Sequence, residues 1–431
     1  MEAINIIISV LSYIGTALTI LTLYKVIFFL VGIFKKKRYP EAKQKHIYGL
    51  CIAARNEEKV IKNLLDSISN QDYPKERLCV FVVADNCTDN TAQIVRDYDK
   101  SKLNVVVYEH NNPDERTKGY ALRYLFDQIK KDFGIELFDG YFIFDADNVL
   151  QKDYVSKMND AFDDGNKIIT SFRKSKNMNQ NWISFAYAMH WLRTCLLENR
   201  AKAVLNQACR IQGTGFLFSN ELVKDGWNYV TLTEDRSFCS DAVVQNYRIV
   251  YCEDAVFYDE QPYNLKVSCR QRIRWAKGHY QSFAENEPKL LKNMFRKNKY
   301  FPTTYDCFWL NFPSAAEGAV RRILTRILTI TLAFLACDYW GGVKGLLIFY
   351  ASYIFKAFLS GVGLVLLVLI CYRKQLGKMP VWKTIWHTLV FFLFDIIGNF
   401  TYYIALFTKV EWKPIPHDTV MEMDKLDNQN K

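Results

Sequence analysis

Residues 140–148 read GYFIFDADN, a short apolar run that ends in two closely spaced carboxylates. The run at 141–144, bounded by turn residues, is typical of a buried central strand. Asp145 and Asp147 would share one face of an extended chain, and two carboxylates that close repel each other unless a cation intervenes. We expect a divalent cation, Mg²⁺ or Mn²⁺, carrying a diphosphate. An ordinary polar turn at the end of a strand is the alternative.

Composition divides the 431 residues into a soluble-looking centre, 40–300, and two apolar ends, enough for one large domain with membrane segments. The formal net charge of +11 suits nucleic acid or an anionic membrane surface. Because the basic runs adjoin apolar segments, we expect a lipid bilayer and no nucleic acid as partner. The 11 scattered cysteines contain no CxxC pair. This argues against zinc and a disulfide framework and indicates a reducing, cytosolic setting.

The first apolar segment, residues 3–24, has no charge and is long enough to cross a bilayer. No basic stretch precedes it and no small-residue cleavage site follows, so a removable signal peptide is not expected. Four basic residues follow at 35–38, and the positive-inside rule places them in the cytoplasm. We predict a protein integral to the plasma membrane, with its N-terminus outside and the following domain in the cytosol.

Strand-like and helix-like segments alternate from residue 46 to residue 145. Strands are expected at 46–54, 80–84, 103–108 and 141–144, with intervening helices from about 60, 91 and 118, the first capped by Asn56. The alternation predicts a mostly parallel α/β sheet covered on both faces, with ligands beyond the carboxyl ends of its strands. Arg55, Glu57, Asp85 and Lys118 fall near that edge. GxGxxG after the first strand and GxxxxGK[ST] are both missing, which argues against dinucleotide oxidoreductases and P-loop NTPases.

An ordered set of motifs makes the chain similar to a known family. They are AARNEE at 53–58, VVADNCTDNT at 82–91, KGYAL at 118–122, DAD at 145–147, GTG at 213–215, TED at 233–235 and QRIRW at 271–275. Together, between membrane segments, they resemble the membrane-integrated family 2 glycosyltransferases, the processive group with cellulose, chitin and hyaluronan synthases. The resemblance covers nearly the whole chain and implies a GT-A-type fold that binds a nucleotide sugar.

The resemblance assigns donor-side roles to residues at the sheet edge. Asp85 would read the nucleoside of a UDP-sugar, although it could simply cap the next helix. Asp147 would ligate the metal that bridges the diphosphate, and Asp145 would contact the ribose or the metal shell. Lys118 would add a charge near the phosphates, with an exposed helix-start lysine as the alternative. Ala53 and Glu57 complete the expected donor set.

The remaining motifs are assigned to catalysis and to the acceptor. By resemblance Asp235, beside Glu234 at a helix start, is the base that deprotonates an acceptor hydroxyl; a helix cap is the alternative. The helical spacing of QxxRW puts its three named residues on one face of a helix. In the family this face lies over the site, and the alternative is an amphipathic helix at the membrane interface. The glycine-rich turn would let backbone approach a sugar, or be an ordinary turn. The expected acceptor residues are Gly213, Thr214, Gly215, Glu234, Gln271, Arg274 and Trp275. We interpret His190, Trp191 and Trp182 as packing residues.

The C-terminal part contains three candidate spans, near 319–340, 345–372 and 384–408. Counted with the first span they would leave the tail outside, whereas residues 412–417, WKPIPH, loosely resemble a motif that is cytosolic in the family. A miscounted span and a divergent tail both stay open. The expected division is a transmembrane helix with basic flank (1–38), a GT-A domain (39–265), interfacial helices with QxxRW (266–316), transmembrane helices (317–410) and a tail (411–431).

These patterns predict a processive, inverting synthase that passes a β-linked polysaccharide outward. UDP-glucose, giving a β-glucan, is the first choice of donor, and a synthase using UDP-N-acetylglucosamine is the alternative. A non-processive transferase acting on polyprenyl phosphate is a further alternative, although its family members lack QxxRW. A catalytically dead membrane scaffold is the rival outside enzymes. The intact aspartates at 85, 145, 147 and 235 argue against it.

Overall fold

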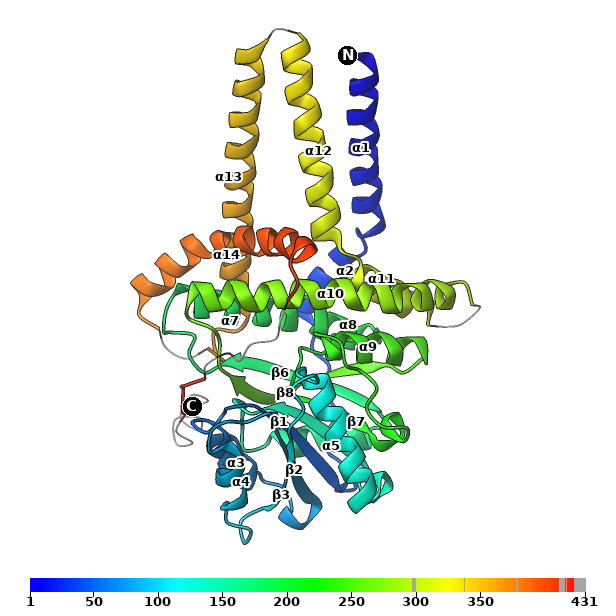
Figure 1. The fold of residues 1–431 in the computed structure, drawn as a ribbon, viewed down its shortest axis with the longest axis vertical. Coiled ribbons are helices and arrows are strands. Elements are labelled where there is room, and N and C mark those ends of the chain that lie inside the picture. Colours follow the sequence, from blue (N-terminus) through cyan, green and yellow to red (C-terminus); the bar gives the residue numbers. More distant parts are fainter. Residues whose placement is uncertain (297–299, 337, 377–378, 411–414, 416, 422–431) are drawn as a thin grey trace.

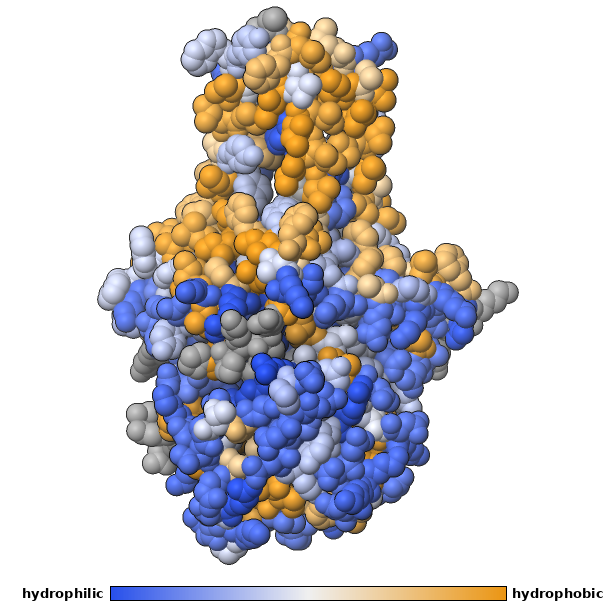
Figure 2. All heavy atoms as spheres, viewed as in Figure 1, coloured by the Kyte–Doolittle hydropathy of each residue, from blue (hydrophilic) through white to orange (hydrophobic). Residues whose placement is uncertain are grey.

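Figure 1 presents the computed structural model of the chain, which describes every residue except 297–299, 337, 377–378, 411–414, 416 and 422–431. A sheet domain forms one end of the molecule. Helices α1 (Glu2–Leu21), α12 (Ser314–Leu335) and α13 (Tyr339–Cys371) stand upright at the other end, and α10 (Leu265–Met294) lies crosswise between. Apolar side chains gather on the upright helices and hydrophilic ones on the sheet domain (Figure 2).

In the part of the chain that the structure describes, the sheet has eight strands in the order β3-β2-β1-β4-β7-β6-β8-β5. Their bounds are Tyr48–Ala54 (β1), Leu78–Asp85 (β2), Asn104–His110 (β3), Gly140–Asp145 (β4), Val149–Leu150 (β5), Ile168–Ser175 (β6), Phe216–Ser219 (β7) and Ile249–Asp259 (β8). Only β7 and β5 run antiparallel to their neighbours. The mostly parallel α/β prediction is therefore confirmed, and the carboxyl ends of β1, β2, β4, β6 and β8 meet at one edge.

Helices bury apolar side chains on both faces of the sheet. One core contains α5 (Lys118–Asp132), α7 (Trp182–Thr194) and α9 (Glu234–Val244), and the other contains α3 (Ile61–Ser69), α4 (Thr91–Arg96) and α6 (Tyr154–Asp163). Burying both faces explains why the strands read as continuous apolar runs. The prediction that Asn56 caps the first helix is wrong. Asn56 has a φ of +57° and accepts a hydrogen bond from the Thr88 N–H at 2.8 Å, while α3 begins only at Ile61.

Within the described residues, three helical segments are long and apolar enough to cross a membrane: Glu2–Phe34, which joins α1 to α2 (Lys25–Phe34), then α13, and α14 (Val381–Phe407). Composition does not predict how they stand. Figure 1 shows α14 lying crosswise beside α10, while α12, which is not among the three, stands upright. Three side chains of α10 donate to backbone carbonyls of α14: Arg272 to Phe394 at 2.6 Å, Tyr280 to Tyr402 at 2.9 Å and Lys277 to Ala405 at 3.2 Å.

The crosswise α14 explains where the tail lies. Residues 417–421 contact the sheet domain, since Asp418 and Thr419 donate backbone N–H groups to Glu260 and Met421 exchanges two hydrogen bonds with Asn63. These contacts place residues 417–421 beside the sheet domain, which a count of three C-terminal spans after the first does not predict. Most of the WKPIPH motif, residues 412–414 and 416, lies outside the described residues.

Candidate active site

A cavity of about 490 Å³ lies between the carboxyl edge of the sheet and the crosswise helices. Its lower wall comes from strand ends, including Ala53, Asp85 and Asp145, and its upper wall comes from α2, α7, α10, α14 and α11 (Phe301–Asn311). Of the predicted site residues, the lining includes Ala53, Glu57, Asp85, Lys118, Asp145, Asp147, Gly213, Glu234, Asp235, Gln271, Arg274 and Trp275. One hollow therefore joins motifs that are spread over more than 200 positions.

Asp85 occupies the end of β2 and is held by several donors. Arg55 forms an ion pair with its carboxylate and donates from Nε to its backbone carbonyl at 2.9 Å. His110 Nδ1 lies 2.8 Å from Asp85 Oδ1, and the Asn86 amide donates to the same oxygen at 2.9 Å. The carboxylate is buried yet lines the cavity. These contacts fix its orientation, as a residue that reads a base or a ribose requires.

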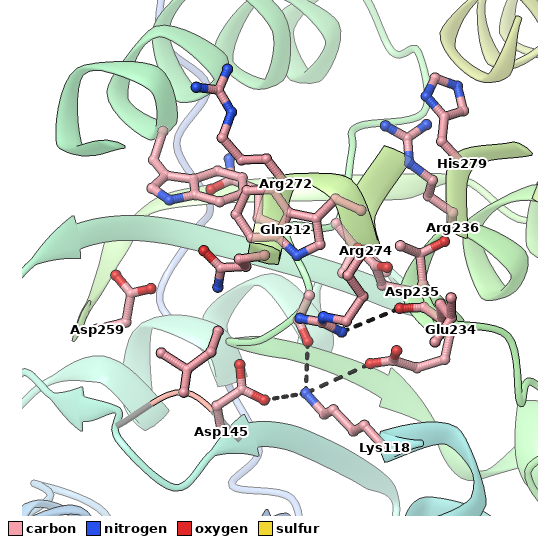
Figure 3. Close-up of a pocket in the computed structure, with 18 of the residues that line it drawn as sticks. Lys118, Asp145, Gln212, Glu234, Asp235, Arg236, Asp259, Arg272, Arg274 and His279 are labelled. Carbon is pink, nitrogen blue, oxygen red and sulfur yellow. Dashed lines mark hydrogen bonds and ion pairs between the residues drawn. The ribbon is translucent and has the colours of Figure 1, made fainter. Parts of the chain in front are cut away.

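Lys118, the first residue of α5, links the donor edge to the opposite wall (Figure 3). Its ammonium forms an ion pair with Asp145, donates to the Gly213 carbonyl at 2.9 Å and lies 3.8 Å from Glu234. Burial alone would lower the pKa of Lys118, but Asp145 and Glu234 raise it. The lysine is therefore charged and centred among acids.

Asp147 lies deeper, in a turn after β4. Its Oδ2 accepts from the Glu260 N–H at 2.9 Å and its Oδ1 from the Asn148 amide at 3.2 Å. Burial would raise the pKa of this carboxyl, but His417 and Lys176 hold it below its usual range. Asp147 is thus an anion at neutral pH. The positive charges of His417 and Lys176 compensate its negative charge.

The donor set around Asp147 fits a metal that is bound partly by its substrate. Among the described residues, no three His, Cys, Asp or Glu side chains are grouped closely enough to hold an ion by themselves. Mg²⁺ typically takes one or two carboxylates and completes its shell with water and phosphate oxygens. Asp147, with Asp145 beside it on the same cavity wall, supplies such carboxylates. The residues fit a diphosphate-bridging cation.

Helix α9 begins at the predicted catalytic motif. Glu234 and Asp235 form its first turn, where free backbone N–H groups favour negative charge. Burial raises the pKa of Glu234 to about 7, against the opposing effect of Lys118. Asp235 is half-buried, and its carboxylate has no hydrogen-bond partner among the described residues. A lone, partly exposed carboxylate facing a cavity is suited to accepting a proton.

The three residues of QxxRW share one face of α10 and line the upper wall of the cavity. Arg274 donates to the Leu232 carbonyl at 3.4 Å. Trp275 meets Trp191 edge to face, with ring centroids 5.6 Å apart. Gln271 has a buried Oε1 with no hydrogen-bond donor among the described residues, so this oxygen is available to a hydroxyl.

Two predicted acceptor residues, Thr214 and Gly215, do not line the cavity. Thr214 is buried, accepts from the Asp145 N–H at 2.9 Å and donates to Asn148 Oδ1 at 2.5 Å. Gly215 has a φ of +66°, and a side chain there would meet the ring of Phe257 at 2.3 Å. These residues position the DAD segment, and only Gly213 of the glycine motif faces the cavity.

Several cavity residues escaped the sequence analysis. Trp191 and His190, interpreted as packing residues, line the cavity, and the guanidinium of Arg173 stacks on Trp191 at 3.9 Å while pairing with Asp259. Residues 259 and 260 could have been predicted from the sequence, because they are acids at the end of an apolar strand, as Asp145 is. His417 approaches from the tail, with Nδ1 3.0 Å from both Glu57 oxygens. No local pattern predicts that contact.

Residues 46–278 match the family described as Glycosyltransferase like family 2. The probable glycosyltransferase YdaM of Bacillus subtilis is 25% identical over 319 residues, covering 68% of this chain and 70% of the relative. A beta-monoglucosyldiacylglycerol synthase of Nostoc is 26% identical, covering 67% of this chain and 62% of the relative.

A poly-beta-1,6-N-acetyl-D-glucosamine synthase of Staphylococcus epidermidis is 23% identical, covering 58% of each chain. The chain thus matches less than two thirds of the length of the Nostoc and Staphylococcus relatives. Among solved structures, the mannosyltransferase PcManGT from Pyrobaculum calidifontis, in complex with GDP-Man and Mn²⁺, superposes with a TM-score of 0.58 at 18% identity, covering 91% of this chain and 99% of that one. This likeness concerns the fold, which is of the GT-A type.

Proposed function

The chain belongs to glycosyltransferase-like family 2, and on this basis we propose that it transfers a sugar, with inversion, from a UDP-sugar to an acceptor held under the crosswise helices. One observation carries the proposal. Gly213, with a φ of +84°, accepts from Lys118 at 2.9 Å through its carbonyl, and a methyl group on its Cα would lie 4.0 Å from Asp235 Oδ2. Gly213 therefore lies between Lys118 at the donor edge and Asp235, the candidate base.

The residues take distinct parts in this reaction. Arg55 and His110 orient Asp85 against the nucleoside, and Asp147 with Asp145 would hold a divalent cation, which neutralises charge on the departing diphosphate. Asp235 accepts the proton of an acceptor hydroxyl as its oxygen attacks the anomeric carbon. The bond between that carbon and the β-phosphate oxygen then breaks, and UDP leaves. The crosswise helices keep water from the reacting atoms.

Two products suit this site. The first candidate is a β-linked polysaccharide made processively, from UDP-glucose or alternatively from UDP-N-acetylglucosamine. It is supported by Trp275, the last residue of QxxRW, which lines the cavity and offers an aromatic ring against which a sugar could pack. Processive synthesis requires a path across the membrane for the polymer.

The second candidate is transfer of a single sugar to a membrane lipid, and the cavity walls favour it. The described lining residues come from the sheet domain, α2, α10, α11, α14 and the tail, and none comes from the upright α12 or α13. The hollow therefore opens at the foot of the upright helices, where a lipid head group could enter sideways. One of the relatives carries the name of a glucolipid synthase.

Purified full-length protein, Mg²⁺ or Mn²⁺ and a panel of UDP-sugars test the proposal through UDP release. Release that depends on one UDP-sugar is the expected result, and none with any donor would favour the non-catalytic scaffold. Chromatography then separates sugar-lipid from polymer, and linkage-specific hydrolases identify any polymer. Trp275→Ala, compared with Trp275→Phe, should shorten a polymer more than it weakens UDP binding.

A further inference from the structure

The half of the cavity that lies beneath the crosswise helices is lined by more cations than acids. Arg210, Arg236 and Arg272 face it, together with Lys25 at the start of α2. Figure 3 shows Arg236 and His279 on the far side of Asp235 from Lys118 and Asp145, so Arg236 stands apart from the donor edge. Lys25 is exposed, which places the mouth of this half at the foot of α1.

The hydrogen bonds of these arginines go to neutral groups or are missing. Arg236 donates from Nη1 to the Leu310 carbonyl at 3.3 Å and to Asn311 Oδ1 at 3.4 Å. Arg272 donates to a backbone carbonyl of α14 and lies over the ring of Phe394. The guanidinium of Arg210 has no hydrogen-bond or ion-pair partner among the described residues. None of the three forms a salt bridge with a described carboxylate.

Nearby carboxylates offset only part of this charge. Glu198 lies among basic residues led by Arg210, which hold its pKa below its usual range although burial would raise it. Asp395 on α14 is already 4.0 Å from Arg193. Lys202 has its own partner, Asp306, at 2.6 Å.

The surplus positive charge lowers the pKa values of the other titratable groups that line this half of the cavity. Burial and then Arg210 lower the pKa of Arg236, and burial and then Arg236 lower the pKa of His279 to about 2. Burying a guanidinium without a counter-ion is costly. An arriving anion would relieve that cost, whereas a neutral glycan would not.

A second observation points to an acceptor of hydrogen bonds. Trp309 on α11 lines this half of the cavity with 9% of its surface exposed. Its indole N–H, which can only donate, is buried without a partner among the described residues. An oxygen-rich group beside Arg210 and Arg236 would supply the missing partner.

We propose that this half of the cavity binds the phosphate group of a membrane lipid that serves as the sugar acceptor, with Arg210 and Arg236 as its ligands. The inference rests on the proposed function and assigns the class of its acceptor. Guanidinium groups match phosphate oxygens in pairs. Arg236 and Asp235 both line the cavity, so a phosphate held by Arg236 would keep a neighbouring hydroxyl of the same head group near the base. The surplus of positive charge in this half of the cavity favours binding of a phosphate group over diacylglycerol or a neutral polysaccharide.

Binding can be measured without turnover, on the full-length protein in non-ionic detergent. The probes are dioctanoyl phosphatidylglycerol and farnesyl phosphate, their neutral counterparts dioctanoylglycerol and farnesol, and inorganic phosphate. We expect both lipid phosphates to bind at least about tenfold more tightly than the neutral lipids and than inorganic phosphate. Arg210→Gln and Arg236→Gln should each weaken that binding about tenfold, Arg210→Lys less, and UDP affinity should stay unchanged. UDP affinity also verifies that each variant is folded.

Lys266→Gln is the matched control, because it removes an exposed charge of α10 outside the cavity. Equal affinity for neutral lipids and phosphate lipids would overturn the assignment, and so would equal affinity for inorganic phosphate and lipid phosphate. Arginine variants that bind lipid phosphate as well as Lys266→Gln does would also overturn it. Sugar transfer separates the two proposals. Lipid phosphate that binds but never receives sugar from any UDP-sugar contradicts the proposed function. Equal transfer to neutral lipids, unaffected by the arginine variants, contradicts the anion site alone.

Discussion

His417 Nδ1 lies 3.0 Å from both carboxylate oxygens of Glu57, across 360 positions of sequence. Burial would lower the pKa of His417, but Asp147 and Glu57 raise it to about 10. The imidazolium therefore holds the tail over the donor edge of the cavity, which both His417 and Ile415 line.

The first prediction is that His417→Ala raises KM for the UDP-sugar about tenfold, the usual effect of losing one charge-assisted hydrogen bond. Since the folded pKa exceeds the ordinary value of 6.5, the contribution of the imidazolium to tail docking is lost as the pH rises through about 10. Burial raises the pKa of its partner Glu57 to about 7, so protonation of Glu57 weakens the same contact as the pH falls below that value. Limited proteolysis across that range measures docking. Val420→Ala, at an exposed position of the tail, is the control, and an unchanged KM would contradict the assignment.

The second prediction concerns the metal. Asp147→Asn should nearly abolish turnover, because a neutral amide is a poor ligand for a hard cation, and a chelator should do the same to the wild-type protein. Asp114→Asn, an exposed change away from the cavity, should retain activity. Full turnover in excess EDTA would remove the metal from the mechanism.

The third prediction separates catalysis from helix capping. Asp235→Asn keeps size and much capping ability, so UDP-sugar should still bind while transfer falls about 10²–10⁴-fold. Asp241→Asn on the same helix, whose carboxylate accepts from Tyr229, should change stability by about 1 kcal/mol and the rate little. If both variants lose the same modest activity, Asp235 is structural.

Much of the donor edge could be predicted because its residues follow directly from local pattern. Strand ends at Asp85 and Asp145 and the helix start at Glu234 are set by apolar runs and by the turns that interrupt them. A parallel sheet then brings such ends together without further information.

Other features depend on contacts between distant segments. The approach of His417 to Glu57 has no local signature. Helix α14 has the composition of a membrane span, and only its hydrogen bonds with Arg272 and Tyr280 of α10 reveal a crosswise position. The turn at Asn56 depends on Thr88, which lies in the next βα unit.

The fourth prediction uses the position of the tail. A reporter fused after Arg38 and another fused after Lys431 should respond on the same side of the membrane, because residues 417–421 bind the sheet domain through Asn63 and Glu260. The positive-inside rule makes that side cytoplasmic. Opposite signals from the two fusions would mean that α14 crosses the bilayer.

The last prediction concerns a buried acid in α10. Glu287 is 6% exposed, its carboxylate has no partner among the described residues, and burial raises its pKa from 4.5 to about 8. Between those values the unfolded chain releases a proton that the folded chain keeps, so stability falls as the pH rises from 4.5 to 8 and is then constant. Each pKa unit corresponds to about 1.4 kcal/mol. Glu287→Gln should therefore raise Tm by several degrees at pH 9 and leave it unchanged near pH 4, whereas Glu285→Gln, exposed on the same helix, should do neither. A Glu287→Gln protein that melts like the wild type at pH 9 would show that the carboxylate is solvated or paired.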